Sequence, residues 1–280
     1  MMDTDYSSVV EVARSYYNSP DADTFYTTVW GGEDLHLGIY ESNADTIFDA
    51  SRRTVDRMAE LSHELKPGAR VLDLGAGFGG TARHLAGQYG CHVVCLNLSE
   101  VENQRSRKMN EQAGLADRIT VVDGSFQSLP FEANTFDVVW SQDAILHSDD
   151  RAQVLREANR VLRSGGQFVF TDPMQSDDCP PGVLDPILQR IHLSSLGSPA
   201  FYQATARELG MEVTRVEDQS QNLVRHYAAV LRETERQESR LRDKGVSQEY
   251  LANMKVGLAR WVDGGKEGWL AWAVFVLTKP

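Results

Sequence analysis

The residues most suggestive of chemistry lie in one glycine-rich stretch, residues 71–80, with the sequence VLDLGAGFGG. An apolar strand pattern leads into this stretch and a helical pattern follows it, which is the context of a nucleotide-binding turn. Its polar and flexible residues are Asp73, Gly75, Gly77 and Gly80. Glycines let the backbone approach a ligand closely, although the G-x-G-x-x-G spacing alone is weak evidence. A carboxylate at the mouth of the loop repels a pyrophosphate and attracts an ammonium group. We therefore expect S-adenosylmethionine rather than NAD, and a turn that serves only packing is the alternative.

A second candidate is His147, which ends the segment SQDAILHS after another strand pattern. A neutral imidazole can orient or deprotonate an amine or hydroxyl. The same histidine could equally cap a turn or bond to a buried carbonyl group, and both readings stay open. Asp172, in the segment DPM, is expected to shape the substrate side. His36 and His147 are not at metal-ligand spacing, so we expect no metal.

Alternating strand and helix patterns must position these residues. We expect strands at 71–74, 92–96, 119–122, 136–140, 167–171, 212–216 and 270–278. The helices between them are expected at 81–89, 99–113, 151–162 and 200–209. Such alternation predicts a parallel sheet, and the carboxyl ends of its strands form the ligand crevice.

Further segments surround this core. A first helix is expected at 6–18, an aromatic loop-like lid at 25–40 and a long helix at 44–65. Helical pieces at about 175–200 and 220–265 are expected to cap the crevice. We therefore divide the chain into an N-terminal helical and lid segment, 1–65, and a capped catalytic domain, 66–280.

Composition limits the possible partners. The formal net charge is -12, without a basic stripe, so a nucleic-acid footprint is absent and a small-molecule substrate is favoured. The three cysteines are not spaced as zinc ligands and are expected to be reduced. The start of the chain does not resemble a signal peptide, and no apolar run approaches a membrane span, which predicts a cytoplasmic protein that does not bind membranes.

Several motifs together resemble a known family. The segments LDLGAGFGG, WSQDAILHS and VLRSGGQFVFTDPM are similar to those of class I S-adenosylmethionine-dependent methyltransferases. More narrowly, FYTTVWGGEDLHLGIY, CLNLSEVENQR, ILQRIHLSSLGS and NMKVGLARWVDGG resemble the sarcosine/dimethylglycine N-methyltransferases of glycine betaine synthesis. The resemblance implies an α/β, Rossmann-like, doubly wound sheet of seven strands, one of them antiparallel, with an N-terminal helical lid and a helical cap before the last strand.

The resemblance also implies a cofactor site. The residues expected to face the methionine end are Asp73, Gly75 and Gly77, with Gln142 near the sulfonium. Asn97 would lie at the ribose, Ser125 and Phe126 at the adenine, and Leu98 is a further cofactor-binding residue. Asn97 is a departure, because most of the superfamily has an acidic residue there, but an amide can still accept one hydrogen bond and donate another.

The implied reaction converts dimethylglycine, and sarcosine before it, to the osmoprotectant glycine betaine. Aromatic rings can stabilise the cation that forms, and the rings we select are Tyr26, Trp30, Tyr40 and Trp261. Tyr26 and His147 are the candidate catalytic residues. Arg190 is the first choice for binding the substrate carboxylate, with Arg225 and His226 as alternatives.

The competing activity is a small-molecule O-methyltransferase in which His147 is the general base. We expect a monomer or a dimer.

Overall fold

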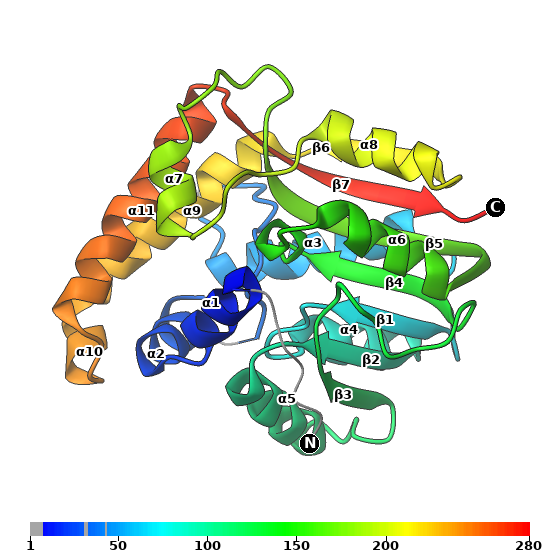
Figure 1. The fold of residues 1–280 in the computed structure, drawn as a ribbon. Coiled ribbons are helices and arrows are strands. Elements are labelled where there is room, and N and C mark those ends of the chain that lie inside the picture. Colours follow the sequence, from blue (N-terminus) through cyan, green and yellow to red (C-terminus); the bar gives the residue numbers. More distant parts are fainter. Residues whose placement is uncertain (1–7, 31–32, 43) are drawn as a thin grey trace.

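The computed structural model describes residues 8–30, 33–42 and 44–280. Within them, a seven-stranded sheet has the strand order β3-β2-β1-β4-β5-β7-β6 (Figure 1). The strands are β1 (Arg70–Leu74), β2 (His92–Asn97), β3 (Ile119–Asp123), β4 (Phe136–Gln142), β5 (Leu162–Gln175), β6 (Glu212–Asp218) and β7 (Leu270–Thr278). Strands β1 to β5 pair in parallel, whereas β7 runs antiparallel to both β5 and β6. The predicted doubly wound sheet with one antiparallel strand is therefore confirmed.

The helices begin where the sequence supplies caps. Ser19, Thr46 and Ser99 each accept a backbone hydrogen bond at the start of a helix, which satisfies an otherwise free N–H group. The helices are α1 (Ser8–Tyr17), α2 (Pro20–Val29), α3 (Ile47–Leu61), α4 (Gly80–Tyr89), α5 (Glu100–Gln112), α6 (Arg151–Val161), α7 (Asp185–Arg190), α8 (Pro199–Glu208), α9 (Ser220–Arg236), α10 (Glu238–Asp243) and α11 (Gln248–Lys266), with the short helix η1 (Ile145–His147).

Alternate side chains of the central strands enter two different cores, because successive residues of a strand point to opposite faces. Leu72 and Leu74 of β1 pack with residues of α6 and α8. Val71 packs on the other face with residues of α3 and α4. Helices therefore cover both faces of the sheet and leave the carboxyl ends of its strands available for a site.

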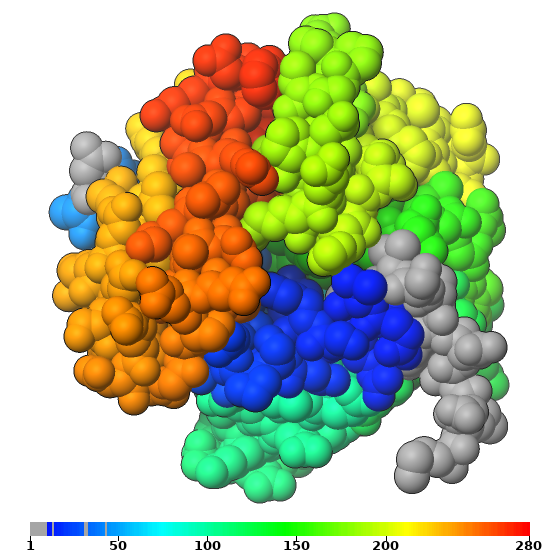
Figure 2. Space-filling model, turned by 60° about the vertical axis from the view of Figure 1, so that its left-hand side comes forward, coloured from blue at the N-terminus to red at the C-terminus, as the bar shows by residue number. Residues whose placement is uncertain are grey.

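A helical layer covers those strand ends. Phe25 and Val29 of α2 share a buried cluster with residues of α9, α10 and α11. Figure 2 shows α1 and α2 (blue) beside α11 (orange) and the α7 region (yellow-green), with an opening where they meet. The N-terminal helices and the insertion before β7 thus build one wall together.

The expectation of a loop at 25–40 is wrong for the first part of this segment. Residues up to Val29 belong to α2, because Ser19 caps a new helix and Pro20 occupies its first turn, where proline is well tolerated. The motif Asn18-Ser19-Pro20 therefore ends one helix and starts the next. Residues 33–40, here called the strap, contain neither helix nor strand.

Other boundaries also differ from the expectation. The strand expected at 167–171 is longer, because β5 begins at Leu162 and ends at Gln175. The helix expected at 44–65 covers Ile47–Leu61, and α9 and α10 are separated at Gln237. Within the described part of the chain, no helix combines the length and the apolar character needed to cross a membrane.

Candidate active site

Two adjoining cavities lie at the carboxyl ends of the central strands in the described part of the chain. The cofactor cavity is lined by the glycine loop, the ends of β2 and β4, and part of the strap. The acceptor cavity is lined mainly by α1, α2, α7 and α11. The residues common to both are Tyr17, Leu35, Asp143 and His147. Two ligands can therefore meet at these four residues, as a direct group transfer requires.

The glycine loop has a backbone that only glycine adopts easily. Gly75 and Gly77 have φ angles of 76° and 52°. A Cβ atom on Gly75 would lie 2.4 Å from the Cβ of Ala144, and one on Gly77 would lie 3.3 Å from Leu35 Cδ1. Both positions therefore favour glycine for conformation, and Gly75 also requires it for space.

Two polar side chains present free atoms in the cofactor cavity. Asp73 is 3% exposed, and its Oδ2 has no hydrogen-bond partner among the described residues. Burial, with a contribution from nearby Asp34, raises the pKa of Asp73 to about 7. Gln142 Oε1 accepts from Thr81 Oγ1 at 2.7 Å and from Trp140 Nε1 at 2.8 Å, which leaves its Nε2 without a described partner. A free acceptor and a free donor suit the ammonium and carboxylate of an amino acid, so the cavity fits the methionine end of S-adenosylmethionine.

The residues expected at the ribose and adenine lie in the same cavity with one exception. Asn97, Leu98 and Phe126 line it, whereas Ser125 does not, and its hydroxyl accepts from a nearby backbone N–H. Asn97 Nδ2 donates to Glu102 Oε2 at 2.9 Å. Glu102, on α5, is buried and also lines the cavity, and burial raises its pKa to about 7. An acidic side chain from the following helix thus lies beside position 97.

The acceptor cavity collects most of the predicted substrate residues. Tyr26, Trp30, Trp261 and Arg190 all line it. Arg190 Nη2 lies 3.0 Å from Met254 Sδ. No carboxylate lies within ion-pair distance of Arg190 in the described parts of the chain. An arginine without a carboxylate partner beside several aromatic rings can bind a ligand that carries both a carboxylate and a cationic amine.

Two predicted substrate residues have a different position. Tyr40 and His226 line neither cavity. His226 Nδ1 accepts from Gly38 N at 2.9 Å and lies 3.3 Å from Tyr40 Oη, while Arg225 donates to the backbone oxygen of Tyr40. Burial lowers the pKa of His226 to about 3, which keeps the ring neutral. These residues attach the strap to α9. The aromatic residues in the sequence of the strap could not show whether they hold the strap in place or contact a ligand.

His147 meets a tyrosine at the junction of the two cavities. Its Nε2 lies 3.1 Å from Tyr17 Oη, with the two rings perpendicular. Burial lowers the pKa of His147 to about 4, so the imidazole is neutral near pH 7 and can accept the hydroxyl hydrogen of Tyr17. Asp172 holds this turn in place, because its Oδ1 accepts from Leu146 N at 2.9 Å. Sequence analysis missed Tyr17, which lies near the end of the first expected helix, 6–18.

Asp143 is a second residue that sequence analysis did not select. It follows β4 with a φ of 53°, an uncommon conformation for a residue other than glycine and one that is concentrated at functional sites. Its carboxylate accepts from Leu37 N at 2.6 Å, Thr171 Oγ1 at 2.8 Å and Trp272 Nε1 at 2.8 Å. Asp143 therefore fixes the strap to the sheet at the junction of the cavities. The sequence feature that could have identified Asp143 is its position directly after a strand.

The remaining rings of the acceptor cavity were also missed. They are Tyr16, Tyr227 and Tyr250, and Tyr16 Oη lies 3.0 Å from Tyr250 Oη. A buried tyrosine needs a hydrogen-bond partner for its hydroxyl. This requirement was the one indication in the sequence that polar groups lie near these residues. No group of three metal-binding side chains occurs among the described residues.

Comparisons with known proteins agree with this geometry. The methyltransferase domain family matches residues 72–170. A sarcosine/dimethylglycine N-methyltransferase from Halorhodospira halochloris is 56% identical over 96% of this chain and 96% of its own length. The enzyme of the same name from Aphanothece halophytica is 53% identical over 99% of this chain and all of its own length.

A solved structure extends the likeness to three dimensions. A protein from Galdieria sulphuraria, proposed to be a sarcosine dimethylglycine methyltransferase, superposes with a TM-score of 0.89 at 43% identity. The superposition covers 94% of this chain and 98% of the other. This chain belongs to the family of sarcosine/dimethylglycine N-methyltransferases.

Proposed function

We propose that this protein transfers methyl groups from S-adenosylmethionine to the nitrogen of sarcosine and dimethylglycine, with glycine betaine as the final product. One observation carries the choice of acceptor: an aromatic cavity adjoins the cofactor cavity and contains an arginine that has no carboxylate partner among the described residues. The names of the relatives point to the same acceptors. We propose a cytoplasmic enzyme, a monomer or a dimer, without nucleic-acid or membrane partners.

The cofactor supplies an electrophilic methyl group when it is bound. On the protein side, Asp73, the glycine loop and Gln142 are proposed to hold its methionine end. Asn97, with Glu102 beside it, is proposed to accept hydrogen bonds from the ribose, and Leu98 and Phe126 to enclose the base. Ser125 is the weakest of the predicted contacts, because it does not line the cavity.

The acceptor is proposed to bind through its two charges. Arg190 binds the carboxylate, since a planar guanidinium matches its geometry. The rings of Tyr26, Trp30 and Trp261 stabilise the quaternary ammonium as it forms, by about 0.5 to 2 kcal/mol per ring. Tyr26 is assigned to this ring set and not to proton transfer, because its hydroxyl lies 3.4 Å from Tyr16 Oη.

Orientation of the acceptor is assigned to Tyr17 and His147. A sarcosine or dimethylglycine nitrogen must be unprotonated before its lone pair can attack. Burial lowers the pKa of His147 to about 4, so its ring is a much weaker base than an amine, and the acceptor is proposed to bind with its amine already unprotonated. Tyr17 Oη can then donate to the neutral His147 Nε2, which lies 3.1 Å away, and its oxygen can accept the N–H of sarcosine.

This assignment predicts the pH dependence of the reaction. We expect kcat/KM for dimethylglycine to rise from pH 6 to pH 9 as more of the free amine becomes unprotonated. His147, with a pKa of about 4, is already neutral over that range and adds no inflection of its own. Initial rates in buffers of constant ionic strength measure the profile. An inflection near pH 6.5 that disappears in His147→Asn would contradict the low pKa.

An acceptor panel tests the proposed function. The protein is incubated with methyl-labelled cofactor and glycine, sarcosine, dimethylglycine, a simple phenol or a sugar. We expect label in the products of sarcosine and dimethylglycine. Efficient labelling of a hydroxyl compound instead, with none in the amines, would replace this proposal with an O-methyltransferase.

A further inference from the structure

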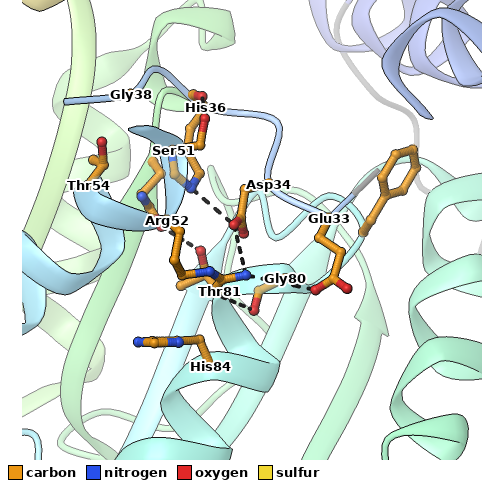
Figure 3. A network of polar contacts seen from close by, with 12 residues as sticks. Glu33, Asp34, His36, Gly38, Ser51, Arg52, Thr54, Gly80, Thr81 and His84 are labelled. Atoms are coloured by element: carbon orange, nitrogen blue, oxygen red, sulfur yellow. Dashed lines mark hydrogen bonds and ion pairs between the residues drawn. The ribbon is translucent and has the colours of Figure 1, made fainter. Parts of the chain in front are cut away.

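An ion-pair network joins the strap to two helices beneath it. Arg52, on α3, places Nη2 2.8 Å from Asp34 Oδ2 and 3.8 Å from Glu33 Oε2 (Figure 3). Its Nη1 donates to the backbone oxygen of Gly80, at the start of α4, at 3.4 Å. The network therefore holds the strap over the first turn of the helix that follows the glycine loop.

Asp34 lies unusually close to that turn. A Cβ atom on Gly80 would be 2.3 Å from Asp34 Oδ1 and 2.5 Å from the backbone oxygen of Glu33. Glycine at position 80 is thus needed for the carboxylate to fit. The side chain of Asp34 is only 1% exposed, so its charge is removed from bulk water.

One oxygen of the Asp34 carboxylate lacks a close partner. Oδ2 is ion-paired with Arg52 Nη2, whereas Oδ1 has no hydrogen-bond partner in the described part of the chain. His36 Nε2 is 3.9 Å from Oδ1, which is too far for a hydrogen bond. A buried carboxylate oxygen without a donor is costly, and this cost points to a group that binds there.

Asp34 and Asp73 line the same cavity from different segments of the chain. Asp34 comes from the strap and Asp73 from the end of β1, and both line the cofactor cavity. Each presents at least one buried oxygen that has no hydrogen-bond partner among the residues described. Their mutual repulsion contributes, after burial, to the raised pKa of Asp73. A ligand with a positive charge would reduce this repulsion, and its N–H donors would supply the missing hydrogen bonds.

The cationic groups of the cofactor differ in what they offer. The sulfonium carries charge but no hydrogen, whereas the ammonium carries charge and three N–H donors. Free acceptor oxygens on two carboxylates therefore match the ammonium. We propose that Asp34 is a second carboxylate that, together with Asp73, binds the ammonium group of the cofactor's amino-acid end. The inference rests on the proposed function, and it makes the strap part of the cofactor site.

Calorimetric titration of the full chain and of Asp34→Asn tests this role. The three ligands are S-adenosylmethionine, S-adenosylhomocysteine and 5′-methylthioadenosine, which lacks the amino-acid end. We expect Asp34→Asn to weaken the first two by about ten- to hundredfold, the usual effect of losing a hydrogen bond to a charged group. Binding of methylthioadenosine should stay within about twofold of the parent protein, because the adenosine site is unchanged.

Any other pattern of ligand affinities for Asp34→Asn overturns the inference. Unchanged affinities would show that Asp34 does not contact the cofactor, and equal weakening of all three ligands would show a structural role only. Weakening confined to S-adenosylmethionine would assign the carboxylate to the sulfonium. If the parent protein itself binds neither S-adenosylmethionine nor its demethylated product, the proposed function fails instead.

A matched control and a second variant complete the experiment. Asp56→Asn removes the charge of an aspartate on α3 that pairs with His84 on α4 at 2.7 Å, outside both cavities, and should leave all three affinities unchanged. Thermal unfolding shows whether Asp34→Asn is folded. If it is not, Asp34→Ser, which removes the charge without adding an amide, must show the same ligand selectivity.

Discussion

Replacing Arg190 with methionine should raise the apparent Michaelis constant for dimethylglycine by about 30-fold or more. The guanidinium is proposed to pair with the acceptor carboxylate, and losing one partner of such a charge pair costs about 2 to 5 kcal/mol. Methionine keeps much of the volume that packs against α11, so the cavity should not collapse. Initial-rate kinetics give the Michaelis constant, and calorimetry should find the affinity for S-adenosylmethionine nearly intact.

Arg225→Met is the matched control for that result. Arg225 was the alternative arginine in the sequence, but it donates to the backbone oxygen of Tyr40 and lines neither cavity. The same loss of charge there should leave the Michaelis constant for dimethylglycine within about twofold, as expected for a site remote from the ligand. The carboxylate assignment is wrong if Arg190→Met leaves the Michaelis constant unchanged, or if Arg225→Met raises it as much.

Replacing Gly77 with valine should abolish binding of S-adenosylmethionine. The φ of Gly77 is 52°, which costs a β-branched residue about 1 to 3 kcal/mol or more. A Cβ atom there would also lie 3.3 Å from Leu35 Cδ1, and the two methyl groups beyond it would enter the cofactor cavity. Calorimetry should detect no binding at concentrations that saturate the parent protein.

A second glycine provides the comparison. Gly87 lies within α4, and a Cβ atom there meets nothing within 4 Å. Gly87→Ala should therefore bind the cofactor normally and be more stable by up to about 1 kcal/mol, because alanine favours the helix. Cofactor binding by a folded Gly77→Val would mean that the loop does not approach the ligand.

The sheet and the cofactor end of the site could be predicted because their signals are local. Strand and helix periods alternate between residues 71 and 171, and in a parallel sheet the carboxyl ends of strands meet at one edge. That rule alone brings Asp73, Asn97 and Gln142 to the same cavity, where the structure places them. The sequence could not show that Ser125 lies outside the cavity, because the backbone conformation of a single residue after a strand decides where its side chain points.

The acceptor side depends on contacts between distant segments, which periodicity does not encode. Tyr17 reaches His147 across 130 positions of the chain, and His226 meets the strap across 188. Residue type indicated aromatic chemistry in this region but not which rings face the ligand. Asp34 gave even less signal, because nothing in its neighbourhood in the sequence shows that it is buried beside Asp73.

Methylation of the dimethylglycine nitrogen is tested by identifying the product. The protein is incubated with S-adenosylmethionine and dimethylglycine at mildly alkaline pH, and the product is identified by mass spectrometry. We expect trimethylated product, glycine betaine, together with one equivalent of S-adenosylhomocysteine. Absence of any trimethylated product, under conditions in which a phenol or sugar hydroxyl is methylated efficiently, would contradict the proposed function.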